Sequence, residues 1–149
     1  MAAAVVIRSL QTADFAGAAA LDEDNLSAWN SKLIAEHVEQ PGSWCFAAWH
    51  NCHKLIVGYI LGKNVADEAE VYRLAVAKEY QRQRIGSRLL SHALAAMKRN
   101  GVRNCFLEVR QSNMAARILY ERAGFAVSGQ RKAYYQNPQE DAVLMTMNM

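Results

Sequence analysis

The chain has 149 residues, of which 52% are hydrophobic and 21% are charged, a balance typical of one domain with a single core. This composition excludes a disordered chain and a fibrous repeat, and no apolar stretch approaches the roughly 20 residues that a membrane-spanning helix needs. The net charge of +3 is mildly basic, which suits anionic ligands but is too small to indicate a nucleic-acid-binding protein. We therefore expect a single domain over residues 1–149 that contacts neither a membrane nor nucleic acid directly.

The N-terminus and the cysteines indicate a cytoplasmic protein without structural disulfides. Residues 1–8 lack a basic start followed by a long apolar segment, so they predict a first strand and not a secretion signal. Cys45, Cys52 and Cys105 are an odd set without paired spacing, which predicts three free thiols. His53 follows Cys52, but no second cluster has the spacing of metal ligands, so we expect no metal site.

The first half of the chain predicts two short helices and a hairpin. Thr12 can cap the first helix, Asn30 or Ser31 can cap the second, and Pro41 must end it. The predicted elements are a strand at 5–10, the two helices with a polar run at 22–25 between them, strands at 43–50 and 55–62 joined by a turn, and a strand at 70–76.

Strands and helices alternate in the second half of the chain. A helix is expected over about 86–100, where Gly101 supplies a left-handed stop, and another begins at a Ser112 cap and ends at Gly124. The predicted strands are at 104–109, 125–129 and 141–147. Because this alternation follows a half rich in hairpins, the sequence predicts a mixed sheet covered by helices.

The stretch that joins the strand at 70–76 to the helix at 86–100 has the order of elements that makes an anion site. A turn that leads into a helix leaves backbone N–H groups without intrahelical partners, and the helix dipole adds partial positive charge there. Arg82, Arg84 and Arg88 add full charges. The stretch therefore predicts a phosphate-bearing ligand, with a solvated surface turn as the alternative.

Glu108 stands inside the otherwise apolar strand at 104–109. An ionised carboxylate is costly in such a strand unless it faces a cleft or a partner. Glu108 is therefore either a general base in a cleft or a structural residue paired with Arg103 or Arg110.

Asn113 and Tyr120 form a second candidate constellation. They lie seven positions apart, about two helical turns, so they project from one face of the last helix and can reach the same ligand. The alternative for Tyr120 is a half-buried aromatic with its hydroxyl at the rim, and the alternative for Asn113 is an extension of the helix cap.

Four segments, in this order, resemble the GNAT acetyltransferase family: 81–86 (QRQRIG), 107–110 (LEVR), 112–116 (SNMAA) and 119–125 (LYERAGF). Within the family the chain most resembles the bacterial enzymes that acetylate the N-terminal alanine of a small-subunit ribosomal protein. That closer resemblance rests on 28–29 (AW), 131–135 (RKAYY) and 140–145 (EDAVLM).

The resemblance implies a GNAT-type α/β fold, a mixed and mostly antiparallel sheet with one parallel, splayed strand pair and helices on both faces. It implies that acetyl-CoA lies between the strand that ends near Val76 and the strand that contains Glu108. The cofactor-binding residues that it implies are Leu74, Ala75, Val76, Gln81, Arg82, Gln83, Arg84, Ile85, Gly86, Ser87, Asn113 and Tyr120.

The chain departs from the family pattern at Arg84, where the turn usually has glycine. Glycine allows a positive φ or a close approach of the phosphate to the backbone. The arginine at this position either obstructs that approach or reaches the phosphates as an added charge-assisted contact.

The resemblance also implies a reaction, the direct transfer of the acetyl group to the N-terminus of a ribosomal protein. Glu108 is the implied general base, Tyr120 the implied general acid, and backbone N–H groups near 74–76 stabilise the oxyanion. The implied substrate-binding residues are Trp29, Glu70, Tyr134 and Tyr135. The alternatives are acetylation of a small-molecule amine or a lysine, and a CoA-binding module without catalytic activity.

Overall fold

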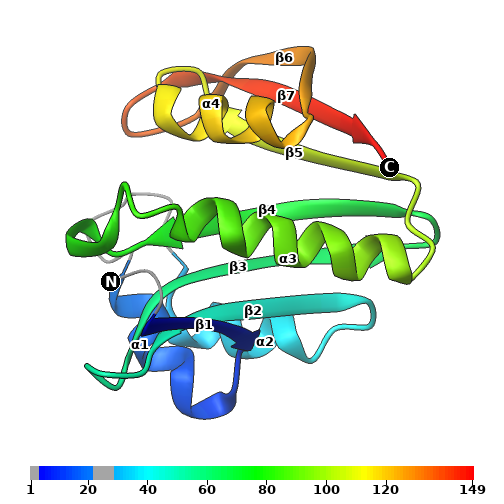
Figure 1. Ribbon diagram of the computed structural model, residues 1–149. Coiled ribbons are helices and arrows are strands. Elements are labelled where there is room, and N and C mark those ends of the chain that lie inside the picture. The colour runs from blue at the N-terminus through cyan, green and yellow to red at the C-terminus, as the bar shows by residue number, and fades with distance from the viewer. Residues whose placement is uncertain (1–3, 22–28) are drawn as a thin grey trace.

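The structure, a computed structural model, describes residues 4–21 and 29–149, so the predicted polar run at 22–25 and Ala28 lie outside the described residues. The described strands form one sheet with the spatial order β1 (Val5–Ser9), β2 (Ser43–His50), β3 (Leu55–Val65), β4 (Glu68–Val76), β5 (Asn104–Arg110), β7 (Glu140–Asn148) and β6 (Ala126–Tyr135) (Figure 1). Neighbours are antiparallel except β4 and β5, which are parallel. The predicted mixed, mostly antiparallel sheet is confirmed.

Helices cover both faces of this sheet, as predicted. The short helices α1 (Phe15–Ala20) and α2 (Ser31–Val38) lie on one face, and α3 (Ile85–Arg99) and α4 (Met114–Ala123) lie on the other (Figure 1). The larger core lies under α3, where Leu89, Leu90 and Met97 are almost completely buried. A smaller core on the opposite face joins α1 and α2 to the sheet. Within the described ranges, no helix is long and apolar enough to cross a membrane.

Local signals set most of the helix ends. The Asn30 side chain accepts a hydrogen bond from the Leu33 N–H at 2.8 Å and so caps the start of α2. Asn30 is one of the two residues predicted as this cap. The prediction of Ser112 as the cap of α4 is wrong. The Asn113 side chain caps this helix by accepting the Ala116 N–H at 3.2 Å, whereas the Ser112 side chain is hydrogen-bonded to Glu140.

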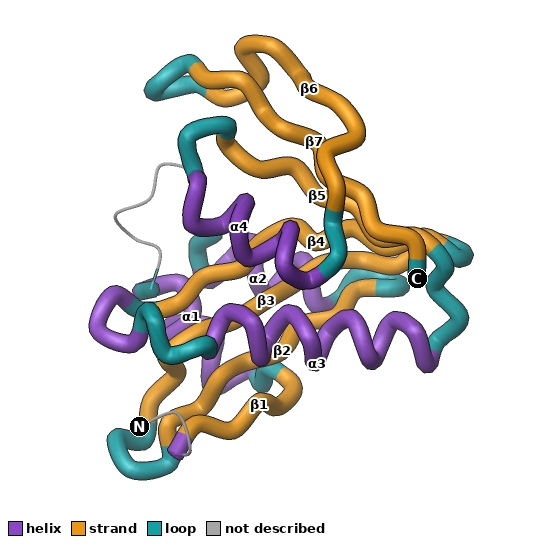
Figure 2. The backbone as a smooth tube through the Cα atoms, turned by 45° about the horizontal axis from the view of Figure 1, so that its top comes forward, coloured by secondary structure: helices purple, strands orange, loops and turns teal. Residues whose placement is uncertain are grey.

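The parallel pair β4 and β5 is joined over only part of its length. The pairing runs from Glu68 opposite Asn104 to Val71 opposite Leu107, and beyond this point the two strands diverge (Figure 2). On its other edge β4 has a bulge, because Val71 pairs with Gly62 and Arg73 pairs with Leu61. A bulge bends a strand and increases its local twist, so we attribute the divergence of β4 from β5 to this irregularity.

Gly62 makes the close approach at this bulge possible. A Cβ atom at Gly62 would lie 2.2 Å from the Glu70 carbonyl oxygen and 2.3 Å from Trp44 Cζ2. Neither distance is compatible with a side chain, and one of the two atoms belongs to the backbone of β4. A glycine is therefore required beside the bulge.

The turn before α3 contains two arginines in the left-handed region, Arg82 with φ 63° and Arg84 with φ 64°. Arg84 is the N-cap of α3, and its side chain makes no capping hydrogen bond. A residue with a Cβ atom is strained in this region by about 1–2 kcal/mol. Arg84 thus has a backbone conformation that glycine would adopt without steric cost.

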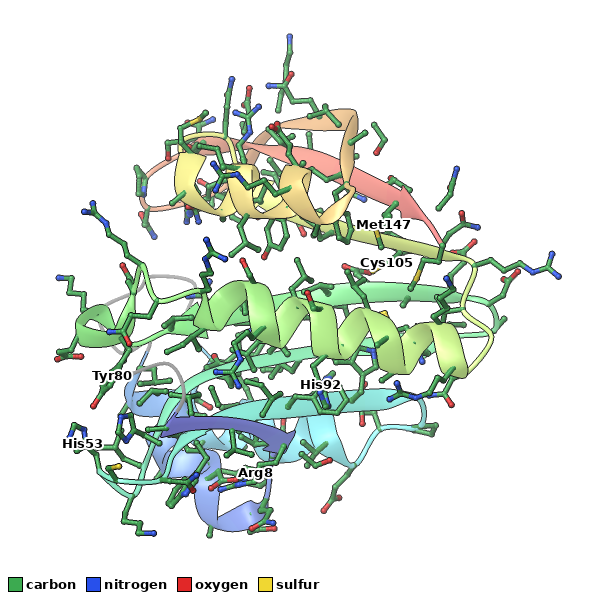
Figure 3. All side chains as sticks on the ribbon, viewed as in Figure 1. Arg8, His53, Tyr80, His92, Cys105 and Met147 are labelled. Carbon is green, nitrogen blue, oxygen red and sulfur yellow. The ribbon has the colours of Figure 1, made fainter. Side chains whose placement is uncertain are left out.

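The turn between β2 and β3 contacts the segment that leads to α3. His53 and Tyr80, the last residue of the 3₁₀ turn η3 (Lys78–Tyr80), lie together at one end of the molecule (Figure 3). The His53 Nδ1 atom and the Tyr80 hydroxyl are joined by a hydrogen bond. This bond connects the hairpin to the start of the turn at 81–84.

Replacement of Gly62 by alanine tests the close approach at the bulge. We expect Gly62→Ala to lower the free energy of unfolding by about 3 kcal/mol, because the new methyl group overpacks against backbone and indole. Gly17→Ala is the matched control. Its Cβ would lie 3.7 Å from Ile56 Cβ, and alanine is the better helix former, so this variant should be as stable as the wild type or more so. Urea denaturation measures the free energy of unfolding of both variants and of the wild type. A Gly62→Ala protein as stable as the wild type would contradict the close approach at Gly62.

Replacement of Arg84 tests the backbone strain at the start of α3. Glycine adopts a positive φ without steric cost, so we expect Arg84→Gly to raise the free energy of unfolding by about 1 kcal/mol. Arg84→Ala keeps the Cβ atom and the strain, and should remain close to the wild type. Equal stabilisation by both substitutions would assign the effect to the arginine side chain and would refute strain in the backbone.

Candidate active site

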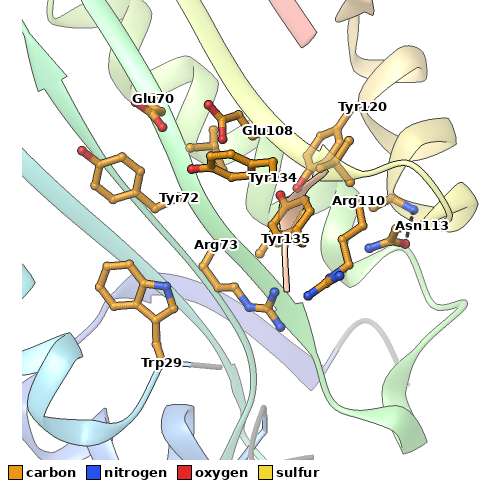
Figure 4. Close-up of a pocket in the computed structure, with 14 residues that line it drawn as sticks. Trp29, Glu70, Tyr72, Arg73, Glu108, Arg110, Asn113, Tyr120, Tyr134 and Tyr135 are labelled. Carbon is orange, nitrogen blue, oxygen red and sulfur yellow. Dashed lines mark hydrogen bonds between the residues drawn. The ribbon is translucent and has the colours of Figure 1, made fainter. Parts of the chain in front are cut away.

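A cavity of about 460 Å³ opens where β4 and β5 diverge (Figure 4). The residues that line it are Trp29, Glu70, Val71, Tyr72, Arg73, Leu74, Glu108, Val109, Arg110, Asn113, Ala116, Tyr120, Tyr134 and Tyr135. A second cavity of about 880 Å³ shares Arg73, Leu74, Arg110 and Asn113 with the first and extends along the end of β4 to Gln81. The gap between the strands therefore continues from one cavity into the other.

The first cavity brings together residues that are far apart in the sequence. Both predicted catalytic residues, Glu108 and Tyr120, line it. So do all four predicted substrate-binding residues, which are Trp29, Glu70, Tyr134 and Tyr135. Asn113 lines both cavities, while Leu74 to Val76 and Gln81 line the second.

Glu108 is held by partners from β6. Its Oε1 atom lies 3.2 Å from Arg131 Nε, and its carboxylate accepts a hydrogen bond from the Tyr134 hydroxyl. The alternative named Arg103 or Arg110 as the partner of Glu108, whereas the ion pair in the structure is with Arg131, and Arg110 Nη1 lies 3.4 Å from Glu140 Oε1. Glu108 therefore has a structural ion pair and also faces the cavity.

Glu70 is the second carboxylate of the cavity and lies on the same side as Glu108 (Figure 4). Burial, followed by the negative charge of Glu108, raises the pKa of Glu70, and the positive charge of Arg131 partly opposes this. A carboxylate whose pKa is raised by burial and by a like charge is a candidate for proton transfer. Glu70 is therefore a candidate base as well as a candidate substrate-binding residue.

Tyr120 is more deeply buried than in the alternative prediction, which was a half-buried ring with its hydroxyl at the rim of the site. It is 7% exposed and packs edge-to-face against Phe125, with a ring separation of 5.8 Å. Burial raises the pKa of Tyr120 to about 12. The phenol is therefore neutral at any physiological pH and can donate a hydrogen bond into the cavity.

Aromatic side chains form two walls of the cavity. Trp29 stacks on Tyr72 with ring centroids 6.2 Å apart, and both pack against the buried His37. On the other side, Tyr134 and Tyr135 meet edge-to-face at 5.1 Å. The space between the walls has large apolar surfaces and the two carboxylates.

Beyond Val71, β4 has a strand partner on one edge only. The Ala77 N–H donates to the Val57 oxygen of β3 at 2.8 Å, and alternate residues of a strand direct their N–H groups to opposite edges. Leu74 and Val76 therefore direct their N–H groups into the gap. Such backbone groups suit an extended, amide-bearing ligand that pairs with them like a strand.

The start of α3 offers donors to an anion. Its first intrahelical hydrogen bond joins the Arg88 N–H to the Arg84 oxygen at 3.0 Å, so the N–H groups of Ile85, Gly86 and Ser87 have no intrahelical acceptor. Gly86 itself faces α4, because a Cβ atom there would lie 3.0 Å from Leu119 Cδ1. The glycine therefore permits close packing of the two helices.

The arginines of this region do not all face the gap. Arg84 and Arg88 line a shallow depression beside β1, where Arg88 Nη2 donates to the Val5 oxygen at 2.8 Å. Gln81 lies on the opposite side, in the second cavity, and its Nε2 atom donates to the Val76 oxygen at 3.1 Å. The N–H groups of Leu74 and Val76 and the side chain of Gln81 therefore face the gap, whereas the side chains of Arg84 and Arg88 face the depression beside β1.

Sequence reasoning did not single out Tyr72, Arg73 or Arg131 as site residues. Tyr72 and Arg73 both line the cavity, although consecutive strand residues normally point to opposite faces, and the bulge accounts for this. The predicted strand at 70–76 is a run of strand-forming residues, so the sequence alone does not predict a bulge there. Among residues 4–21 and 29–149, no group of three or more His, Cys, Asp or Glu side chains is placed to hold a metal ion.

Comparison with known proteins agrees with this geometry. Residues 6–125 match the model of the acetyltransferase (GNAT) family. The [ribosomal protein bS18]-alanine N-acetyltransferase of Escherichia coli K12 is 38% identical over 94 residues, which are 62% of this chain and 64% of that protein. The match to this curated relative thus spans less than two thirds of its length.

Solved structures extend the similarity over the whole fold. The crystal structure of the ribosomal-protein-S18-alanine N-acetyltransferase from Escherichia coli has a TM-score of 0.87 and 32% identity, covering 97% of this chain and 93% of that one. A putative streptothricin acetyltransferase from Bacillus anthracis, solved in complex with acetyl coenzyme A, has a TM-score of 0.67 and 27% identity, covering 77% and 67%. The family match, the splayed parallel strands and the cavity between them lead to one conclusion: the chain belongs to the GNAT acetyltransferase family.

Proposed function

We propose that this protein transfers the acetyl group of acetyl-CoA to the N-terminal α-amine of an alanine, on the small-subunit ribosomal protein bS18. The observation that carries the proposal is the continuous gap between β4 and β5, with unpaired backbone donors on one side and two carboxylates between aromatic walls on the other. The relatives named for bS18 alanine acetylation supply the acceptor.

Acetyl-CoA fits backbone groups of the second cavity and of the start of α3. The N–H groups of Leu74 and Val76 are available to the amides of its pantetheine arm, and those of Ile85 to Ser87 are available to its pyrophosphate. Acetyl-CoA supplies an activated carbonyl carbon, and the related structure with acetyl coenzyme A supports this choice. A backbone N–H of β4 near Leu74 to Val76 then stabilises the oxyanion that develops on the carbonyl oxygen.

Two residues of the cavity handle the protons. The neutral amine of the acceptor forms a bond to the thioester carbonyl carbon, and the carbon–sulfur bond breaks. Glu108 receives the proton that the amine nitrogen loses, directly or through water. Tyr120, neutral at working pH, donates its hydroxyl proton to the leaving sulfur. Because the amine attacks the thioester directly, no cysteine or serine nucleophile is needed.

The acceptor side favours an N-terminal amine. Trp29 and the pair Tyr134 and Tyr135 offer broad apolar walls with few rotamers to restrict, and their polar atoms can bond to an acceptor backbone. An α-amine has a pKa near 7.7–8.0 and a lysine near 10.4, so a lysine needs roughly 3 kcal/mol more to reach its neutral form at the same pH.

Conservative substitutions test the proton chemistry. Glu108→Gln and Tyr120→Phe each remove a proton-transfer group while they keep the shape of the side chain. We expect each to lower kcat by a factor on the order of 10² to 10⁴, with little change in acetyl-CoA affinity by calorimetry. Glu70→Gln is the comparison variant, because Glu70 is the other carboxylate of the cavity. A Glu108→Gln enzyme with near wild-type turnover across pH 6–9, together with an impaired Glu70→Gln enzyme, would move the base to Glu70.

A competition assay tests the acceptor. An alanine-starting peptide with the bS18 N-terminal sequence, the same peptide blocked at its N-terminus but containing lysine, and a polyamine compete for the enzyme with acetyl-CoA. We expect acetylation of the free alanine terminus, because its amine is largely ready to react near neutral pH. Preferred acetylation of the blocked peptide or of the polyamine would overturn the acceptor, and CoA binding without acetyl transfer to any amine would overturn the enzyme.

A further inference from the structure

The strand β6 is irregular where it passes the cavity. Arg131 pairs with Ala142 of β7, and Tyr135 pairs with Glu140. Three residues of β6, 132–134, therefore lie opposite a single residue of β7, Asp141. Such an insertion interrupts the ladder of backbone hydrogen bonds and leaves N–H groups that need another acceptor.

The side chain of Asp141 supplies that acceptor. Its Oδ1 atom accepts the Ala133 N–H at 2.7 Å, and its Oδ2 atom accepts a hydrogen bond from Gln130 Nε2 at 2.8 Å. Ala133 has a φ of 53°, in the left-handed region that a residue with a Cβ atom rarely adopts. A charge-assisted hydrogen bond to the backbone of this residue stabilises the conformation.

The irregular segment decides where two tyrosines point. In a regular strand, the consecutive residues Tyr134 and Tyr135 would lie on opposite faces of the sheet. Here both line the cavity (Figure 4). The Tyr134 hydroxyl donates to Glu108, and the Tyr135 ring lies 4.3 Å from the Arg110 guanidinium carbon.

Glu140, the residue before Asp141, also holds a backbone segment in place with its carboxylate, beside the second cavity. Glu140 accepts the Ser112 N–H through Oε2, and its Oε1 atom lies 3.4 Å from Arg110 Nη1. These contacts fix the turn that leads to Asn113 and α4, beside the second cavity. Two adjacent carboxylates of β7 thus hold different parts of the site.

We propose that Asp141 is a positioning residue for the acceptor: through the Ala133 N–H it holds Tyr134 and Tyr135 over the first cavity. The role rests on the proposed function, because the Asp141 side chain contacts Gln130 and Ala133, on the side of the gap assigned to the peptide. It touches neither reacting group, and its loss therefore affects acceptor binding more than acetyl-CoA binding.

Three variants test this role. Asp141→Ala removes both acceptor atoms, whereas Asp141→Asn keeps one oxygen that can accept the Ala133 N–H. Gln130→Ala is the matched control, because it removes the other partner of the carboxylate and leaves the bond to Ala133 in place. Each variant is assayed for the KM of the alanine-starting peptide, the KM of acetyl-CoA and the calorimetric affinity for CoA.

We expect Asp141→Ala to raise the peptide KM about tenfold, the size expected for the loss of one charge-assisted hydrogen bond, with both CoA constants unchanged. Asp141→Asn should restore most of the peptide affinity, and Gln130→Ala should resemble the wild type. A peptide KM that is unchanged in Asp141→Ala, or that rises equally in the alanine and asparagine variants, would overturn the proposal.

Hydrogen exchange of the Ala133 amide gives a readout that needs no activity. The amide should exchange slowly in the wild type and in Asp141→Asn, and faster in Asp141→Ala, while amides of β5 keep their protection. Equal protection of Ala133 in all three proteins would refute the contact on which the role depends. A wild-type enzyme that acetylates no peptide would instead refute the proposed function, and would leave this contact standing.

Discussion

The site depends on the loss of pairing between two neighbouring strands. β4 and β5 are parallel partners from Glu68 to Val71, and a bulge at Tyr72 then turns β4 away from β5. The bulge is possible because Gly62 leaves room for the backbone of β4. Two properties follow from this one irregularity: backbone donors face an open gap, and the adjacent side chains of Tyr72 and Arg73 both reach the cavity.

The negative charge of the cavity is partly balanced by an arginine from β6, a strand at the edge of the sheet. Two carboxylates in a partly buried space repel each other, which is part of why the pKa of Glu70 is raised. Arg131 of β6 has its Nε atom 3.2 Å from Glu108 Oε1, and its positive charge partly opposes the rise in the pKa of Glu70. Tyr120 remains neutral behind them because burial raises its pKa to about 12. Two carboxylates and a neutral phenol thus share one cavity, and a guanidinium lies beside one of the carboxylates.

Much of the fold could be predicted from local signals. The residues predicted as catalytic and substrate-binding do line the first cavity, but their contacts could not be predicted. The cap at Asn30 and the glycines that end α3 and α4 act within a few residues, so the helix predictions were close to the structure. The partner of Glu108 was predicted incorrectly because Arg131 reaches it from β6, across β7, and the register between these strands is not a local property. The bulge at Tyr72 was not predicted for the same reason.

The order of strands in the sheet also has a consequence for how the protein folds. β7 follows β6 in the chain, and yet it lies between β5 and β6. β6 therefore has no native strand partner until β7 is in place, because β7 is its neighbour in the described sheet. Until β7 has paired with β5, Tyr134 and Tyr135 belong to a segment that has no place in the sheet. The aromatic wall that these two tyrosines form is therefore complete only when β7 lies between β5 and β6.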